Sequence, residues 1–261
     1  YAVLIKDVNK IRYEFEKAIY ISNSGRKGPV LIDLPDDIQR MNVNSKHQKK
    51  FIIKDKKNSN IKKDILANIT DIKRLLEKSN KPLLIIGNGV KLSKSESLVK
   101  RFIKKTNIPY APTWAAVDIF NSKDKLNAGT FGVAATRYGN FAVQNADLLI
   151  FMGARISPQI LGSNPDLFSP KSKKVIIDID KNEFKNHRLP KIKLKINSNI
   201  RDVLKLLNKS ILKHNNLDKW NDKISFYKKN FPITSKINYK KNKFVDPYAF
   251  FSELSKVTKK N

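Results

Sequence analysis

Apolar residues along the middle of the chain recur at two spacings, one typical of helices and one of buried strands. The helical spacing places Ile61, Ile65, Ile69, Ile72 and Leu76 on one face of a predicted helix. Short continuous apolar runs suit strands that are covered on both faces, as in a parallel sheet. Such runs predict strands at Leu83–Ile86, Pro109–Thr113, Asp147–Met152, Lys174–Ile179 and Leu194–Ile196.

Helical patterns lie between the first three of these predicted strands and after the last one. They cover Ser95–Lys105, Tyr138–Asn145 and Ile200–Leu207. Strands that alternate with helices form parallel sheets through right-handed crossover connections. We therefore predict an α/β fold, a doubly wound and Rossmann-like parallel sheet, for residues 61–212, with partial segments on either side.

The start of the chain lies outside this alternating pattern. It predicts a helix at Asn9–Ser22 and a strand, buried on both faces, at Val30–Leu34. One helix and one strand do not make a domain, so we expect a fragment whose first domain begins before Tyr1. Residues 43–60 are polar and basic, which predicts a solvated linker.

The end of the chain is also polar. Residues 213–261 include an amphipathic stretch around Trp220 and a final helical pattern through Phe250, Leu254 and Val257. The final helix has an apolar side and no remaining sheet to cover. We therefore expect a linker here, followed by the start of another domain.

Composition excludes several classes of function. The chain has no cysteine, which rules out disulfides, thiolate metal sites and cysteine nucleophiles, and its three histidines are scattered. No apolar run approaches the ~20 residues of a membrane span, so we expect a soluble protein with no membrane partner. Motifs for Ser/His/Asp catalysis, for zinc hydrolysis and for a phosphate-binding Walker loop are also absent, so we assign no catalytic or metal-binding residue.

The formal net charge of +30 raises nucleic-acid binding as a rival hypothesis. The basic residues are spread along the whole chain, without a recognisable DNA- or RNA-binding motif. We therefore expect no nucleic-acid partner. A stand-alone basic nucleotide- or nucleic-acid-binding module stays as the alternative from another class of protein.

Candidate ligand-binding loops lie where the predicted strands end, the edge at which open α/β sheets bind ligands. Three of them contain glycine: Gly87-Asn88-Gly89, Gly129 to Thr136, and Gly153-Ala154-Arg155. Glycine lets backbone N–H groups approach a pyrophosphate, although an ordinary strand-to-helix turn also needs glycine.

Several side chains at these strand ends have two interpretations. Arg155 either holds a phosphate or pairs with Asp178 or Asp180. The acidic run Asp178-Ile179-Asp180 either binds a ribose hydroxyl or caps the following helix. The nearby aromatic residues either stack on a flat ring or belong to the core, and they are Trp114, Tyr138 and Phe141.

A more specific motif lies near the start of the chain. The pattern R-x-G-P-V-x-x-D-x-P-x-D-x-Q is formed by Arg26, Gly28, Pro29, Val30, Asp33, Pro35, Asp37 and Gln39. Together with Lys81–Gly89 and Ala146–Arg155, this segment resembles the thiamine-diphosphate-dependent enzymes of the acetolactate synthase (large subunit) family. The resemblance covers nearly the whole chain.

That family has three α/β domains, and the resemblance implies which parts are present. Residues 1–42 are expected to end the pyrimidine-binding domain, and residues 43–60 to form a linker. Residues 61–212 are expected to form the central domain. Residues 213–261 are expected to form a linker and the start of the pyrophosphate-binding domain, with Val245–Leu254 resembling its lead-in helix.

The resemblance also implies an activity for the full-length protein. Such an enzyme decarboxylates a 2-keto acid such as pyruvate and ligates the product to an acceptor, in branched-chain amino acid biosynthesis. Thiamine diphosphate and magnesium would be bound by parts absent here, so the fragment alone is expected to be inactive. A homodimer or homotetramer in the cytoplasm is implied. A thiamine-dependent decarboxylase or carboligase with another substrate is the alternative.

In acetolactate synthases the central domain resembles a flavin-binding module, which implies FAD as one alternative here. The positions carried over are Gly87, Asn88, Gly89, Thr113, Trp114, Gly132, Val133, Ala134, Thr136, Gly153, Ala154, Arg155, Asp178 and Ile179. This chain departs from the family pattern in three places. Where the family has F-D-D-R, this chain has Ile156–Gln159, and where the family has a histidine, it has Ala134. A later G-D of the family is Ser198-Asn199 here. The other alternative is a central domain that has a structural role and binds no FAD.

Overall fold

The computed structural model describes residues 1–53, 60–184, 189–212, 214–239 and 244–258. The chain divides into two compact units, Tyr1–Asp64 and Ile65–Asn261, which are described separately. No helix among the described residues is long and apolar enough to cross a bilayer.

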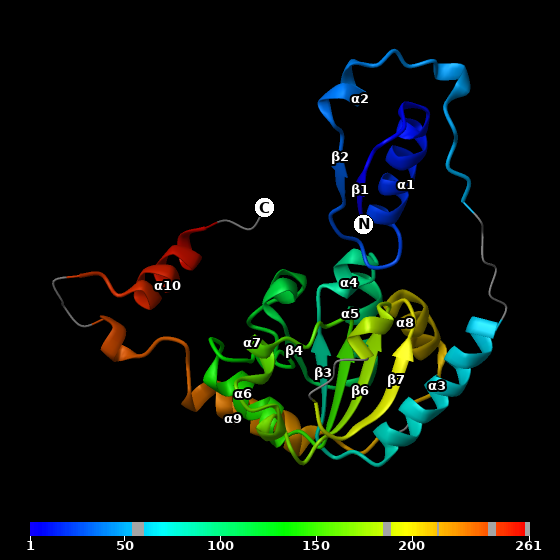
Figure 1. The fold of residues 1–261 in the computed structure, drawn as a ribbon. Coiled ribbons are helices and arrows are strands. Elements are labelled where there is room, and N and C mark those ends of the chain that lie inside the picture. Colours follow the sequence, from blue (N-terminus) through cyan, green and yellow to red (C-terminus); the bar gives the residue numbers. More distant parts are fainter. Residues whose placement is uncertain (54–59, 185–188, 213, 240–243, 259–261) are drawn as a thin grey trace. The chain divides into compact units, whose positions relative to one another are not determined.

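The first unit is built on a two-stranded parallel sheet (Figure 1). Strand β1 (Ala2–Leu4) pairs with β2 (Leu31–Asp33), and helix α1 (Ile11–Asn23) connects them. A short helix, α2 (Asp36–Arg40), follows β2. The predicted helix and strand are confirmed. Strand β1 was not predicted, because a three-residue apolar run at a chain end carries no periodicity.

The expectation that β2 is buried on both faces is wrong for this unit. Leu31 is 65% exposed, and the neighbouring Ile32 is only half-buried. Two strands and one helix leave much of the sheet uncovered, whereas burial on both faces requires helices on both sides.

Part of the predicted linker packs along α1. The Gln48 side chain accepts a hydrogen bond from Arg12 N–H (3.1 Å) and donates to the carbonyl of Val8 (2.9 Å). The Phe51 N–H donates to Glu16 at 2.8 Å, and its ring lies 5.6 Å from that of Tyr13. Residues up to Phe51 are therefore attached to the first unit rather than freely solvated. Residues 54–59 of the predicted linker lie outside the described part of the chain.

The second unit contains a five-stranded parallel sheet in the order β4-β3-β5-β6-β7 (Figure 1). The strands are β3 (Pro82–Ile86), β4 (Tyr110–Pro112), β5 (Leu148–Met152), β6 (Lys173–Asp178) and β7 (Ile192–Asn197). The chain passes from β3 to its neighbour β4 and then returns to the other side of β3. The predicted doubly wound α/β fold is confirmed, and all five predicted strands are present within two residues of their expected ends.

Helices precede the first of these strands, connect several of them and follow the last one. They are α3 (Asn60–Glu77), α4 (Gly89–Leu92), α5 (Glu96–Thr106), α6 (Arg137–Asn145), α7 (Pro158–Leu161), α8 (Ile200–Lys209), α9 (Asp218–Asn230) and α10 (Pro247–Val257). The four-residue helices α4 and α7 were not predicted, because one turn is too short to show a helical period.

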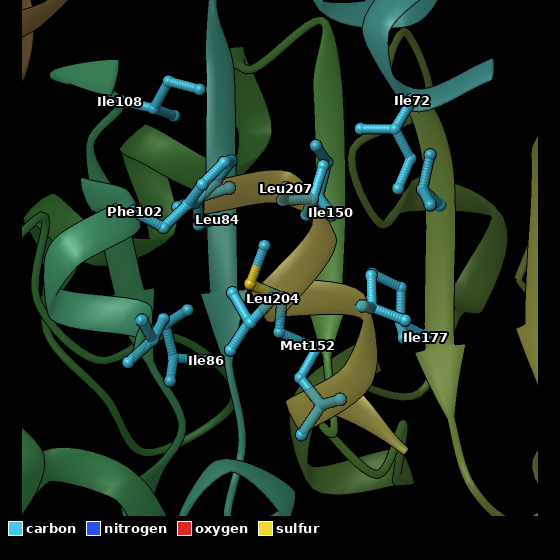
Figure 2. Close-up of a cluster of buried hydrophobic side chains, with 14 of the residues drawn as sticks. Ile72, Leu84, Ile86, Phe102, Ile108, Ile150, Met152, Ile177, Leu204 and Leu207 are labelled. Atoms are coloured by element: carbon cyan, nitrogen blue, oxygen red, sulfur yellow. The ribbon is translucent and has the colours of Figure 1, made fainter. Parts of the chain in front are cut away.

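Side chains of alternate strand residues point to two separate cores. One core joins Leu84, Ile150 and Ile177 of the sheet to Phe102 of α5 and Leu204 of α8, as Figure 2 shows. Helix α3 contributes its buried isoleucines to the same core. The other core joins the intervening strand residues, such as Ile85 and Phe151, to α6 and α9. Helices therefore cover both faces of the sheet, which explains the continuous apolar strands.

Helix α9 differs from the linker expected after residue 212. Trp220 and Ile224 are buried against the sheet in the second core, and the Trp220 indole N–H donates to the carbonyl of Pro82 at 2.9 Å. The helix thus belongs to the packed unit. Its sequence is dominated by lysine, aspartate and asparagine, and its narrow apolar stripe gave only a weak signal.

Lys174 of β6 is a buried cation. Its Nζ donates to the carbonyls of Ser169 (2.9 Å) and Ser172 (3.1 Å), and its side chain is fully buried. Burial lowers the pKa of Lys174 from 10.5 to about 8, and the positive charge of Lys191 adds to this effect. The folded protein therefore releases this proton at lower pH than the unfolded chain.

We expect this difference to make stability rise with pH. Between about pH 8 and pH 10.5 the unfolded chain holds the Lys174 proton that the folded chain has released, so the unfolding free energy increases, by up to about 3 kcal/mol. Denaturant unfolding across this range tests it, with Lys174→Met compared with the exposed Lys173→Met. An equal pH dependence in the parent and Lys174→Met would contradict it.

Candidate functional site

The ends of the five strands are joined by backbone hydrogen bonds that continue past the sheet. The N–H of Gly87 donates to Met152 O at 3.1 Å, and the N–H of Gly153 donates to Ile177 O at 2.9 Å. Thr113 N–H reaches Ile86 O (2.8 Å), and Ser198 N–H reaches Asp178 O (3.0 Å). The candidate positions after β3, β4, β5 and β6 therefore lie along one edge, as the sequence predicted for a parallel sheet.

Glycines after β3 and β5 lie in direct contact. A Cβ atom at Gly87 would lie 2.2 Å from Gly153 O and 2.3 Å from Ala154 Cα. At Gly89 it would lie 2.8 Å from Gly153 Cα, and the Gly89 N–H donates to Gly153 O at 2.9 Å. These glycines are required because two backbones touch here. Asn88 lies between them and precedes α4.

The loop before α6 is fixed by side chains of that helix. Asn140 accepts a hydrogen bond from Gly132 N–H (2.8 Å) and donates to Gly132 O (3.0 Å). Val133 N–H donates to Gln159 O at 2.9 Å, and Gly132 adopts a φ of +119°, which favours glycine. Val133 and Ala134 are exposed.

Thr136 caps helix α6. Its hydroxyl accepts from Gly139 N–H at 3.1 Å and donates to Thr130 O at 2.8 Å. This is the hydrogen-bonding pattern of an N-cap threonine, and it uses the hydroxyl that a ligand would otherwise contact.

The segment after β4 is a short 3-10 helix, Trp114–Ile119, preceded by Thr113. Trp114 is half-exposed, whereas Tyr138 and Phe141 are partly buried. Phe141 packs on Phe231 with ring centres 4.8 Å apart, which favours the core interpretation for that residue.

Arg155 pairs with a residue that the sequence did not suggest. Its Nε lies 3.7 Å from Glu183 Oε1, and Glu183 is largely buried while Arg155 is exposed. Glu183 follows β6 in a 3-10 helix, Lys181–Phe184, and no sequence spacing links it to a residue 28 positions earlier.

The acidic turn after β6 uses its own carboxylates. Asp178 Oδ1 accepts from Asp180 N–H at 2.9 Å, and Asp180 Oδ1 accepts from Asn182 N–H at 2.9 Å. The capping interpretation therefore holds for Asp180 at the start of the 3-10 helix. Ile179, between the two aspartates, is partly exposed.

An ion pair beyond β3 was also not predicted. Lys91 Nζ, on α4, lies 2.6 Å from Asp118 Oδ2, on the Trp114–Ile119 helix. The hydrogen bond from Lys91 lowers the pKa of the Asp118 carboxyl. Three further residues hold the loops at this edge in place and were not identified from the sequence. They are Asn140, Gln159 and Glu183. Within the described parts of the chain, no group of three or more histidine, aspartate or glutamate residues is placed to hold a metal ion.

Comparison with known proteins shows two kinds of similarity. The family profile of the thiamine pyrophosphate enzyme, central domain, matches residues 69–207, which include all five strands of the sheet.

Among curated relatives, the acetolactate synthase large subunit of Cyanidium caldarium is 30% identical over 270 aligned residues, which cover 100% of this chain and 45% of that protein. Acetolactate synthase 1, chloroplastic, of Zea mays is 29% identical, with 98% of this chain and 40% of that protein covered. Acetolactate synthase 2, chloroplastic, of Nicotiana tabacum is 31% identical, with 89% of this chain and 35% of that protein covered. The chain thus spans less than half the length of these relatives.

Proposed function

The chain belongs to the thiamine pyrophosphate enzymes and carries their central domain, and we propose that it is part of an acetolactate-synthase-like enzyme. One observation supports this choice within the family. Similarity to an acetolactate synthase large subunit covers 100% of the chain, including the residues before and after the central domain.

We assign the complete protein a 2-keto acid as substrate, with pyruvate as the donor. One molecule loses CO₂, and the remaining two-carbon unit forms a carbon–carbon bond with an acceptor. Thiamine diphosphate and magnesium, when bound, would supply the carbanion chemistry for the loss of CO₂. We assign both to the parts of the relatives that lie beyond this chain, which include more than half of their length.

The part described here then has a scaffold role. Its sheet is covered by helices on both faces, and its carboxyl edge is fixed by backbone hydrogen bonds. We propose that it sets the spacing between the cofactor-binding domains. A cytoplasmic homodimer or homotetramer that works in branched-chain amino acid biosynthesis completes the proposal, and the mass of the purified complete protein in solution tests its assembly.

CO₂ release from pyruvate tests the proposed activity. We expect the complete gene product to release CO₂ only when both thiamine diphosphate and Mg²⁺ are added. The 261-residue chain assayed under the same conditions is the control, and it is expected to release none. Absence of cofactor-dependent CO₂ release by the complete protein would contradict the proposal.

A further inference from the structure

We propose that the carboxyl edge of the sheet is a closed backbone seam, and that this domain binds neither flavin nor another dinucleotide there. The seam consists of the segments Gly87–Gly89 and Gly153–Arg155, and the nearby loop before α6 is held separately through Gly132 and Val133 by Asn140 and Gln159. The proposal goes beyond the proposed function, because it stands whether or not the complete protein forms acetolactate.

The first argument concerns backbone donors. A dinucleotide at the switch point of a doubly wound sheet is held by N–H groups that point at its pyrophosphate. Here five N–H groups along this edge donate to acceptors within the chain. The acceptors are Met152 O for Gly87, Gly153 O for Gly89, Asn140 Oδ1 for Gly132, Gln159 O for Val133, and Ile177 O for Gly153. A ligand would have to break these bonds, which are part of the folded structure.

The second argument concerns space. The switch point lies between β3 and β5, because the chain leaves β3 toward β4 and later returns to place β5 on the opposite side. At this point the two loops touch, since a Cβ at Gly87 would lie 2.2 Å from Gly153 O. The chain's own backbone therefore occupies the space directly between Gly87 and Gly153, at the point where other sheets of this class bind a ligand.

The third argument concerns charge. A pyrophosphate needs cations or free amides around it. Lys91 after β3 is paired with Asp118 at 2.6 Å, and Arg155 after β5 is paired with Glu183 at 3.7 Å. Asp178 accepts the Asp180 N–H, so its Oδ1 is used where a ribose hydroxyl would bind. The cations after β3 and β5 therefore already lie beside carboxylates, which disfavours a pyrophosphate at these positions.

Ligand content tests the proposal directly. The 261-residue chain is purified without added cofactor, denatured, and analysed for released flavin by fluorescence. We expect no stoichiometric flavin, and no rise in Tm on addition of FAD, NAD or ADP. Stoichiometric flavin, or a saturable rise in Tm with any of these probes, would overturn the proposal.

Glycine variants test the seam itself. We expect Gly87→Ala to lower Tm by about 5–10 °C, because two backbones must separate to admit the methyl group. Gly28→Ala is the matched control, since nothing lies within 4 Å of its added Cβ. If Gly87→Ala does not fold, Gly89→Ala gives a milder version of the same test, with a closest contact of 2.8 Å. An unchanged Tm for both seam variants would show that the loops do not form a closed seam.

Discussion

Replacing Trp220 with alanine lowers the free energy of unfolding by about 3–5 kcal/mol in our account. Trp220 lies on α9, is only 4% exposed, and packs in the core between that helix and the sheet. The variant removes this apolar surface and leaves the Pro82 carbonyl without its indole N–H donor, which lies 2.9 Å away. Urea unfolding followed by circular dichroism measures the change.

The chain offers a matched control, because it has two tryptophans. Trp114 is 50% exposed, so Trp114→Ala should lower the free energy of unfolding by no more than about 1 kcal/mol. A small effect at both positions would mean that α9 does not contribute to the folded unit. A large effect at Trp220 alone would establish that the unit extends past residue 212 and includes α9.

The Phe102→Ala variant is expected to have a similarly large effect, about 3–5 kcal/mol. Phe102 is fully buried on α5 and belongs to the core that also contains Leu84 and Leu204 (Figure 2). Its ring fills space between a helix and the sheet, and truncation leaves a cavity that the surrounding strands cannot close. Thermal unfolding of the purified chain measures the loss.

Phe226→Ala is the control for this second prediction. Phe226 also lies on a helix, is 51% exposed, and has Lys223 Nζ 4.8 Å from its ring centre. We expect Phe226→Ala to lower the free energy of unfolding by less than about 1 kcal/mol, because only partial burial and the cation–π contact are lost. Equal losses for Phe102→Ala and Phe226→Ala would contradict the assignment of the core.

Most of the sheet was predictable from the sequence because β3, β4, β5 and β6 are buried on both faces, whereas the edge strand β7 alternates between exposed and less exposed residues. Continuous apolar runs such as Leu83–Ile86 occur where no strand residue faces water, and the helices between them show a clear period. Strand β1 was missed because three residues carry no pattern. Helix α9 was assigned to a linker because most of its residues are polar and only Trp220, Ile224 and Tyr227 are buried.

The candidate site was predictable in position but not in chemistry. Glycines at the strand ends indicated close backbone approach, and the structure shows that the approaching group is another loop of the same chain. A sequence does not distinguish a glycine that admits a phosphate from one that admits a backbone. The ion pair of Arg155 with Glu183 depends on the fold, which brings the loops after β5 and β6 together.

Identification of the product formed from pyruvate by the complete gene product tests the central claim most directly. Our account predicts acetolactate, formed with release of one CO₂ per molecule and dependent on thiamine diphosphate and Mg²⁺. Cofactor-dependent CO₂ release with a different product would place the protein elsewhere among the thiamine pyrophosphate enzymes. No reaction of pyruvate at all would contradict the proposed function.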